Sequence, residues 1–275
     1  MPFQFSDQHI DDYHRLGYTV FRGIVPPKLI DALRRVTDEA RVLAREKFGP
    51  QSQRLQPVAA FEIDQQPFHD FRDLPELRDA VARVLTPQHV YATEGMLGVL
   101  LEPADEPYCT AWHRDWRDNI PGLNLSDWDA VMNDIDLFNQ LNCALYADNS
   151  TWVVPGSHLR RDLPGEAARF PDRPIAGPDL AGLSYAEREA ACLEYCRSLP
   201  GAVRLELDAG DFALYRNALW HIGNYVPYRK RATLHDAVDT PAFAAWREKV
   251  LPEAVKRREA GLHWENPNVP ANAIN

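Results

Sequence analysis

The sequence predicts a mainly β fold with flanking helices, arranged as an antiparallel sandwich or jelly roll. Short β-rich segments separated by Gly, Pro, Asp and Asn run from residue 89 to 240, and mainly helical patterns occupy residues 1–88. The 275 residues are 45% hydrophobic, enough to bury one large core. We therefore expect a single domain over residues 1–275, with an insertion at 159–199 and a C-terminal helix and tail at 241–275.

Helical patterns dominate the N-terminal third. Ser6 is suited to cap a first helix and Gly17 to end it, and a short β-rich run, YTVFRGIV, follows. Pro26 favours the start of a longer helix, whose apolar residues recur at helical spacing until Gly49. The stretch from 74 to 85, LPELRDAVARVL, predicts another amphipathic helix.

Seven β-rich segments follow in the order HVYATEGMLGVLLEP, YCTAWHRDW, LFNQLNCALYA, TWVVPGSH, AVRLEL, GDFALYRNALWHIG and KRATLHDAV. The insertion between the fourth and the fifth contains a predicted helix, SYAEREAACLEYCRSL. PAFAAWREKVLPEAVKRREAG predicts a last helix before a tail rich in Pro and Asn. This order of short strands with one helical interruption predicts an antiparallel β core.

Charge and composition narrow the partners. Thirty basic residues against forty acidic ones give a net charge of −10, which disfavours binding to nucleic acid or to an anionic membrane. MPFQFSDQHI has no basic n-region, and the sequence has no apolar run long enough to span a membrane. The four cysteines lack CxxC spacing, so we expect free thiols in a reducing, cytoplasmic setting. Because the charge disfavours nucleic acid and membranes, we expect a small molecule as the partner.

The stretch YCTAWHRDWRD contains the first candidate metal ligands. Side chains at i and i+2 of a strand share a face, so His113 and Asp115 are predicted to point into the barrel, with Trp112, Arg114 and Trp116 facing the other way. Such a pair is two thirds of a 2-His-1-carboxylate triad, which leaves coordination positions open for substrate and oxygen.

The chain has nine histidines, and the third ligand must be one of those other than His113. His221 is the strongest candidate because it ends a predicted strand and precedes a loop and a returning strand. His158 ends VVPGSH and His235 follows RATL. The others lie before the β region or in polar segments: His9, His14, His69, His89 and His263.

A basic cluster follows His221. A triad iron that uses oxygen needs a two-electron co-reductant, and 2-oxoglutarate can serve if a planar, bidentate cation holds its far carboxylate. Arg231 lies ten residues after His221 on the next predicted strand. Strand alternation turns Lys230 away, and Arg229 is an alternative anchor.

These motifs together resemble the phytanoyl-CoA dioxygenase family of iron(II)- and 2-oxoglutarate-dependent oxygenases. The resemblance rests on SDQHIDDYHRLGYTVFRGIVPPKLIDALRR, WHRD, LNCALYADNSTWVVPGSH, and GDFALYRNALWHIG with Arg231, in that order. It implies a double-stranded β-helix, a cupin-like jelly roll with N-terminal helices. It also implies His113, Asp115 and His221 as iron ligands.

The resemblance further implies Arg231 as the anchor of the 2-oxoglutarate 5-carboxylate. Many members carry a small hydroxylated residue where this chain has Gly223, so a second hydrogen bond must come from another group. Asn142 is a further candidate cosubstrate contact, with an ordinary core Asn as the alternative. DNSTW replaces the family's usual turn and is expected to bring Trp152 near the site.

The implied activity is oxidation of a substrate C–H bond, usually hydroxylation, with iron(II), 2-oxoglutarate and O2, and with release of succinate and CO2. Related halogenases have a small residue where this chain has Asp115, which favours hydroxylation. Candidate substrate contacts are Trp116, Trp152 and Arg117. A smaller secondary metabolite or an amino-acid-like molecule is the expected substrate. The alternative is a non-catalytic cupin-like protein that binds a metal or small ligand, in which Arg231 would have no obvious use.

Overall fold

We describe the chain from a computed structural model covering residues 3–167 and 177–262. Residues 168–176 of the predicted insertion lie outside the described residues, and so does the predicted tail from residue 263 onwards, with His263. The helices within the described ranges are α1 Asp7–Leu16, α2 Pro27–Phe48, α3 Gln66–Arg72, α4 Pro75–Val84, α5 Leu125–Asp129, α6 Pro164–Ala167, α7 Tyr185–Arg197 and α8 Pro241–Glu259, with 3₁₀ turns at Val58–Ala60 and Ser157–Leu159.

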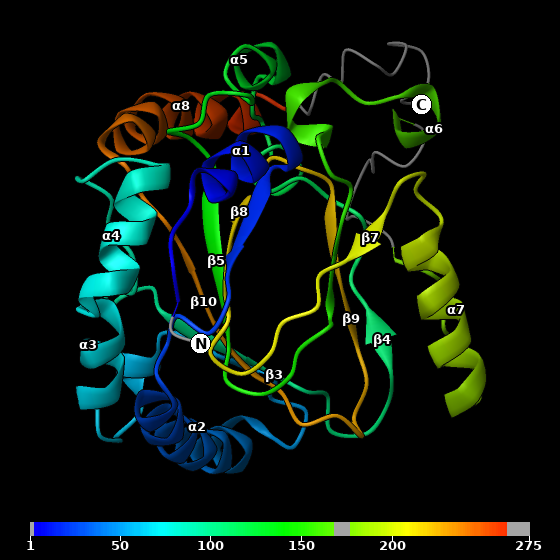
Figure 1. Cartoon of the computed structure of the whole chain (residues 1–275). Helices are drawn as coiled ribbons and strands as arrows, with labels where there is room; N and C mark the ends of the chain where they lie inside the picture. The colour runs from blue at the N-terminus through cyan, green and yellow to red at the C-terminus, as the bar shows by residue number, and fades with distance from the viewer. Residues whose placement is uncertain (1–2, 168–176, 263–275) are drawn as a thin grey trace.

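Two antiparallel sheets form the centre of the molecule (Figure 1). The larger has the order β1-β8-β5-β10-β3-β2 and the smaller β4-β9-β6-β7. The strands are β1 Tyr18–Phe21, β2 Arg54–Leu55, β3 Gly98–Leu101, β4 Tyr108–Cys109, β5 Asn139–Ala144, β6 Thr151–Val153, β7 Val203–Arg204, β8 Phe212–Arg216, β9 His221–Tyr225 and β10 Ala232–Ala237. The predicted mainly β fold with flanking helices is confirmed. The single-domain division stays a prediction.

Helices flank both sheets, and α1, α5 and α8 lie across one end of them (Figure 1). In Figure 1, α2, α3 and α4 lie on one side of the larger sheet, and α7 stands beside β4 and β9 of the smaller one. None of the described helices combines the length and the apolar character needed to cross a membrane.

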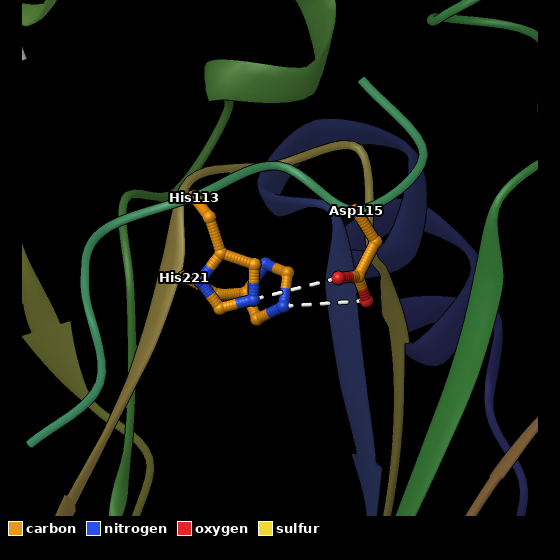
Figure 2. A group of neighbouring side chains, drawn as sticks. All are labelled: His113, Asp115 and His221. Carbon is orange, nitrogen blue, oxygen red and sulfur yellow. Dashed lines mark ion pairs between the residues drawn. The ribbon is translucent and has the colours of Figure 1, made fainter. Parts of the chain in front are cut away.

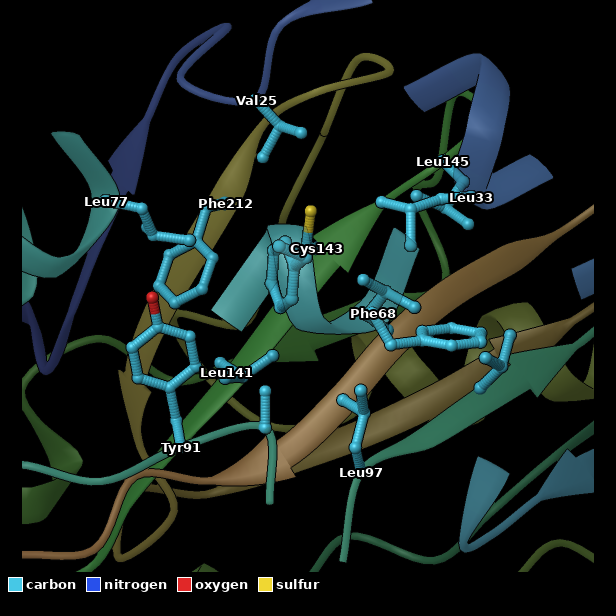
Figure 3. Packing of buried hydrophobic residues seen from close by; sticks show 14 of the residues in the cluster. Val25, Leu33, Phe68, Leu77, Tyr91, Leu97, Leu141, Cys143, Leu145 and Phe212 are labelled. Atoms are coloured by element: carbon cyan, nitrogen blue, oxygen red, sulfur yellow. The ribbon is translucent and has the colours of Figure 1, made fainter. Parts of the chain in front are cut away.

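The main hydrophobic core fills the space between the larger sheet and these helices (Figure 3). Leu141 and Cys143 of β5 are fully buried in it beside Phe212 of β8. Their chain neighbours Gln140 and Asn142 point to the opposite face, where they line a cavity. One strand therefore serves both the core and the candidate site, and a register slip by one residue would exchange the two faces.

The predicted ends of α1 are confirmed. Ser6 is the N-cap, and Gly17 follows the helix in the left-handed region with φ 85°. A Cβ at Gly17 would also lie 2.5 Å from Nδ1 of His158, so the close approach requires glycine as well. His158 is buried here with its Nε2 3.2 Å from the His14 carbonyl oxygen, away from the metal motif.

Candidate metal centre and cavity

The chain segment that carries the first metal motif leaves the sheet earlier than predicted. β4 ends at Cys109, and His113 makes only an isolated antiparallel bridge with His221. The backbone N–H of each donates to the other's carbonyl, at 3.2 and 3.0 Å. Asp115 lies in a turn after this bridge, so the prediction that one strand presents both residues is wrong.

The turn places Asp115 opposite the two imidazoles. Its backbone N–H donates to the carbonyl of Asn217 at 2.9 Å, and Trp116 follows in the left-handed region with φ 68°. Figure 2 shows the carboxylate facing both rings. Nε2 lies 3.4 Å from a carboxylate oxygen in His113 and 3.5 Å in His221. The three ligand atoms lie within 4.8 Å of one another, a spacing that a single metal ion can bridge.

Backbone carbonyls fix the tautomer of both histidines. Nδ1 of His113 lies 2.7 Å from the Ala111 carbonyl oxygen, and Nδ1 of His221 lies 3.0 Å from that of Leu219. A carbonyl only accepts, so each Nδ1 must carry the proton and donate it. In the neutral ring, the Nε2 lone pair then faces Asp115. This is the arrangement in which histidine ligates a metal.

Electrostatics favour an ionised carboxylate at this site. Burial opposes the charge of Asp115, yet the positive charge of His221 and the hydrogen bonds from both histidines hold its pKa well below the usual value. Burial likewise opposes protonation of His113, but the Asp115 carboxylate outweighs it and raises the pKa of His113. A metal ion bound by the neutral histidines would likewise favour the ionised form of Asp115.

Asn119 orients the carboxylate from the side. Its Nδ2 donates to Oδ1 of Asp115 at 2.7 Å, which restricts the rotation of the carboxylate. The metal motif in the sequence did not identify Asn119, although this residue follows Asp115 by only four positions. Asn119 also lines the cavity and is exposed to solvent.

A buried ion-pair network stabilises the turn that carries Asp115 and Trp116. Asp162 at the start of the insertion has a fully buried side chain, 2.9 Å from a guanidinium nitrogen of Arg114 and 2.7 Å from one of Arg117. Asp118 accepts a hydrogen bond from the backbone N–H of Arg114 at 2.7 Å and pairs with Arg117. Both arginines are almost fully buried. Paired charges of this kind fix a backbone geometry, because breaking one pair leaves a buried charge.

Arg231 lies just before β10 and is 4% exposed. Its Nε donates to Asp148 at 2.8 Å, and its guanidinium lies 4.9 Å from the ring centre of Tyr225. Its backbone N–H donates to Glu102 at 2.8 Å. These bonds leave the terminal nitrogens of Arg231 without an acceptor among the described residues, and Arg231 lines the cavity. Lys230 points outward to Asp38 as predicted, and Arg229 is exposed and does not line this cavity.

Gly223 is required by the position of Tyr225. A Cβ at residue 223 would lie 1.8 Å from the phenol oxygen of Tyr225, far inside contact distance. The phenol therefore occupies the space that a hydroxylated side chain at position 223 would fill. Tyr225 is packed against Tyr108, with ring centres 4.9 Å apart, and both line the cavity beside Arg231.

The triad and Arg231 line one cavity of about 530 Å³ between the two sheets. Asn142 also faces it, and donates from Nδ2 to Thr151 at 3.1 Å while its Oδ1 lies 2.9 Å from Nδ1 of His235. Asn142 therefore bonds to side chains of the cavity wall rather than serving as a core Asn bonded to backbone. His235 lines the cavity but stands apart from the triad.

The three expected substrate contacts have different outcomes. Trp116 lines the cavity because the left-handed turn reverses its predicted direction, and its ring packs edge-on against Phe243 of α8 at 5.0 Å. Arg117 was expected there but is buried in the ion-pair network. Trp152 was also expected there, but it faces α7 and lies under Arg204 at 4.7 Å, while its neighbour Thr151 lines the cavity.

The chain matches no protein-family model, and a comparison with curated proteins found no match either. Solved structures share its fold. AviO1 from Streptomyces viridochromogenes Tue57 has a TM-score of 0.56 at 16% identity, over 88% of this chain and 98% of that one. SnoN, a non-heme alpha ketoglutarate dependent epimerase from nogalamycin biosynthesis, has 0.53 at 15%, over 85% and 80%. EctD from S. alaskensis with bound Fe has 0.53 at 16%, over 86% and 77%.

Proposed function

We propose that this protein is an iron(II)- and 2-oxoglutarate-dependent dioxygenase that oxidises a C–H bond of a small molecule and releases succinate and CO2. The observation that carries the proposal is the shared cavity: two histidines with Nε2 free for a metal, one carboxylate, and a buried arginine whose terminal nitrogens face the same space. The proposal includes the phytanoyl-CoA dioxygenase family, the double-stranded β-helix and a cytoplasmic setting.

The donor set fits iron(II). His113 and His221 would bind it through Nε2 and Asp115 through a carboxylate oxygen, which leaves open positions for cosubstrate and oxygen. Iron bound there would activate O2 at the expense of 2-oxoglutarate. EctD, which shares the fold, carries Fe in its structure. SnoN is described as an alpha ketoglutarate dependent enzyme.

Arg231 is suited to hold the far carboxylate of 2-oxoglutarate. Asp148 occupies its Nε, so the two terminal nitrogens form a bidentate pair whose direction is fixed before binding. The adjacent Tyr225 phenol is placed to donate the second hydrogen bond, in place of the hydroxyl that position 223 lacks. Asn142 of β5, the strand paired with β10, is a further polar side chain that lines the cavity.

The substrate is proposed to bind near Trp116, over the triad. Asp115 occupies the carboxylate position, which favours C–H oxidation over halogenation. Hydroxylation is the proposed outcome. Desaturation, cyclisation or epimerisation would require only a different placement of the substrate, and SnoN, with the same fold, is an epimerase. A secondary metabolite or an amino-acid-like molecule fits the size of the cavity.

The binding of cosubstrate can be tested without knowing the substrate. Iron(II) and 2-oxoglutarate are titrated into the protein under anaerobic conditions, and the weak visible charge-transfer band is recorded. We expect Arg231→Gln to lower 2-oxoglutarate affinity by roughly 10–100-fold, because a charged hydrogen-bond pair is lost. Arg229→Gln, two residues away and exposed, is the matched control and should leave affinity unchanged.

A wild-type protein that binds iron(II) but shows no such band would contradict the proposed function. It would favour a cupin-like binding protein that holds a metal without oxygen chemistry. Equal losses in the two arginine variants would instead show that Arg231 has no specific part in cosubstrate binding.

A further inference from the structure

A second arginine faces the cavity from its solvent-exposed side. Arg54 belongs to β2, the edge strand of the larger sheet, and is paired in register with Leu100 of β3. Leu55 and Val99, the next pair in that register, are fully buried in the core on the other face. Because side chains alternate along a strand, Arg54 and Leu100 lie on the cavity face, and both line it.

The guanidinium of Arg54 is oriented through one nitrogen only. Its Nε donates to Oε1 of Gln56 at 2.5 Å, and the amide nitrogen of Gln56 donates to the carbonyl of Met96. Gly98 leaves room for this arrangement, because a Cβ there would lie 3.0 Å from Cβ of Gln56. Gln56 is thereby held between β3 and Arg54, and it engages the Nε of the guanidinium while the side chain of Arg54 lines the cavity.

No residue in the described part of the chain accepts a hydrogen bond from those terminal nitrogens or pairs with their charge. Arg231 differs in this respect, because Asp148 neutralises it. Arg188, in the adjoining surface hollow, pairs with Glu106 at 2.9 Å. Asp105, in the same hollow, accepts a hydrogen bond from Gln51.

The charge of Arg54 acts on the cavity interior. The pKa of His235 is lowered to about 3, first by burial and then by the positive charge of Arg54. His235 lies on β10, which is separated from β2 by β3, and both side chains line the cavity. The side chain therefore presents an uncompensated positive charge to the space that lies beside the triad.

We propose that Arg54 binds a carboxylate of the oxidised substrate, so that the enzyme selects small organic acids. This inference rests on the proposed function. The two arginines would divide the work in the same geometry: each is held through Nε, and each offers its terminal pair to a carboxylate. Arg231 would receive the cosubstrate from its buried position, and Arg54 the substrate from the exposed side.

The test compares each acid with its own amide. Aliphatic and phenyl-substituted monocarboxylates, each with the matching primary amide, are titrated into the anaerobic complex with iron(II) and 2-oxoglutarate. Quenching of tryptophan fluorescence reports binding, since Trp116 lines the cavity. We expect the best acids to bind roughly 10–100-fold more tightly than their amides. Arg54→Gln should abolish this preference, keep 2-oxoglutarate affinity, and remove stimulation of succinate release by those acids.

Arg188→Gln is the control for a general loss of positive charge near the opening, and it should retain the preference for acids. If no acid binds the wild type more tightly than its amide, the inference is wrong. It is also wrong if Arg54→Gln loses affinity for 2-oxoglutarate itself, because Arg54 would then belong to the cosubstrate. A wild type that binds no 2-oxoglutarate would instead overturn the proposed function, so the two failures are distinct.

Discussion

At the scale of single residues, the candidate site depends on the Nδ1 protons of His113 and His221 and on the absence of a side chain at Gly223. Carbonyls of Ala111 and Leu219 hold the protons on Nδ1 of the two histidines, and so leave both Nε2 atoms for a metal. Gly223 leaves space for the phenol of Tyr225 beside Arg231. The carbonyls of Ala111 and Leu219 and the phenol of Tyr225 were not among the residues predicted from the sequence to form the site.

Replacing Gly223 tests whether the phenol holds the position we assign to it. We expect Gly223→Ser to destabilise the protein by about 1–3 kcal/mol, because a Cβ would overlap the Tyr225 hydroxyl, and to weaken 2-oxoglutarate binding as the phenol moves. Urea unfolding and anaerobic titration measure the two effects. Gly95→Ser is the control, since a Cβ there meets nothing within 4 Å.

The double variant Gly223→Ser with Tyr225→Ala should recover stability relative to Gly223→Ser alone, because the overlap is gone. If Gly223→Ser is as stable as wild type and binds 2-oxoglutarate equally well, the phenol does not occupy that space in solution.

At the scale of elements, the insertion stabilises the turn that carries Asp115 and Trp116. Asp162 at its start pairs with Arg114 and Arg117, which flank Asp115 and Trp116 in the turn. On the other side, α8 supports the same turn through the contact between Phe243 and Trp116. Asp115 thus owes its position to two elements that are remote in sequence.

Asp162→Asn should have a large effect on this support. It removes the carboxylate that pairs with two buried guanidinium groups, so we expect a loss of about 3–5 kcal/mol in unfolding free energy and weaker metal binding. Thermal unfolding and titration with iron(II) are the measurements. Asp11→Asn, on the exposed face of α1, should change neither. Unchanged metal affinity in a destabilised Asp162→Asn would limit the network to stability.

Elements whose signals lie within the element itself were predicted from the sequence, whereas side-chain positions that depend on residues distant in sequence were not. Caps and periodicity predicted α1, α2, α4, α7 and α8 because those signals lie within each helix. Strand alternation failed after Cys109, since a left-handed Trp116 turns the chain. The replacement of the family's usual turn by DNSTW led to the expectation that Trp152 lies near the site, but its neighbour Thr151 lines the cavity instead.

Arg117 illustrates the distant cause. Its neighbours in sequence suggested a site residue, but Asp162, 45 residues later, draws it into the interior. The roles of Asn119, Tyr225 and Arg54 depend on contacts across turns and sheets, and the sequence carries no spacing signal for them. The structure does bring together His113, Asp115 and His221, which motif spacing had selected.

At the scale of the whole molecule, the larger sheet separates the stabilising core from the reactive space. Its odd and even residues along β10 serve opposite faces, with Leu234 in the core and His235 in the cavity. Asp236 of the same strand is 3% exposed, and burial raises its pKa to about 6 against the effect of its backbone hydrogen bonds. The stability of the fold should therefore depend on pH through this residue.

The sign of that dependence follows from linkage. An unfolded Asp titrates near 3.9, so the folded protein keeps this proton to higher pH than the unfolded chain. Asp236 costs nothing below about pH 4, and the cost grows to about 3 kcal/mol above pH 6. We expect Asp236→Asn to raise the unfolding free energy at about pH 8 and not at about pH 4. An equal effect at both pH values in urea unfolding would contradict this assignment.

The most direct test of the whole account is succinate formation by the purified protein with iron(II), 2-oxoglutarate, ascorbate and air. The assay covers a panel of small organic acids and amides, and Asp115→Ala, checked for folding by circular dichroism, is run in parallel. We predict succinate from the wild type, increased by its substrate, and none above background from Asp115→Ala. Absence of succinate from wild-type protein throughout the panel, or equal amounts from both proteins, would contradict an oxygenase built on His113, Asp115 and His221.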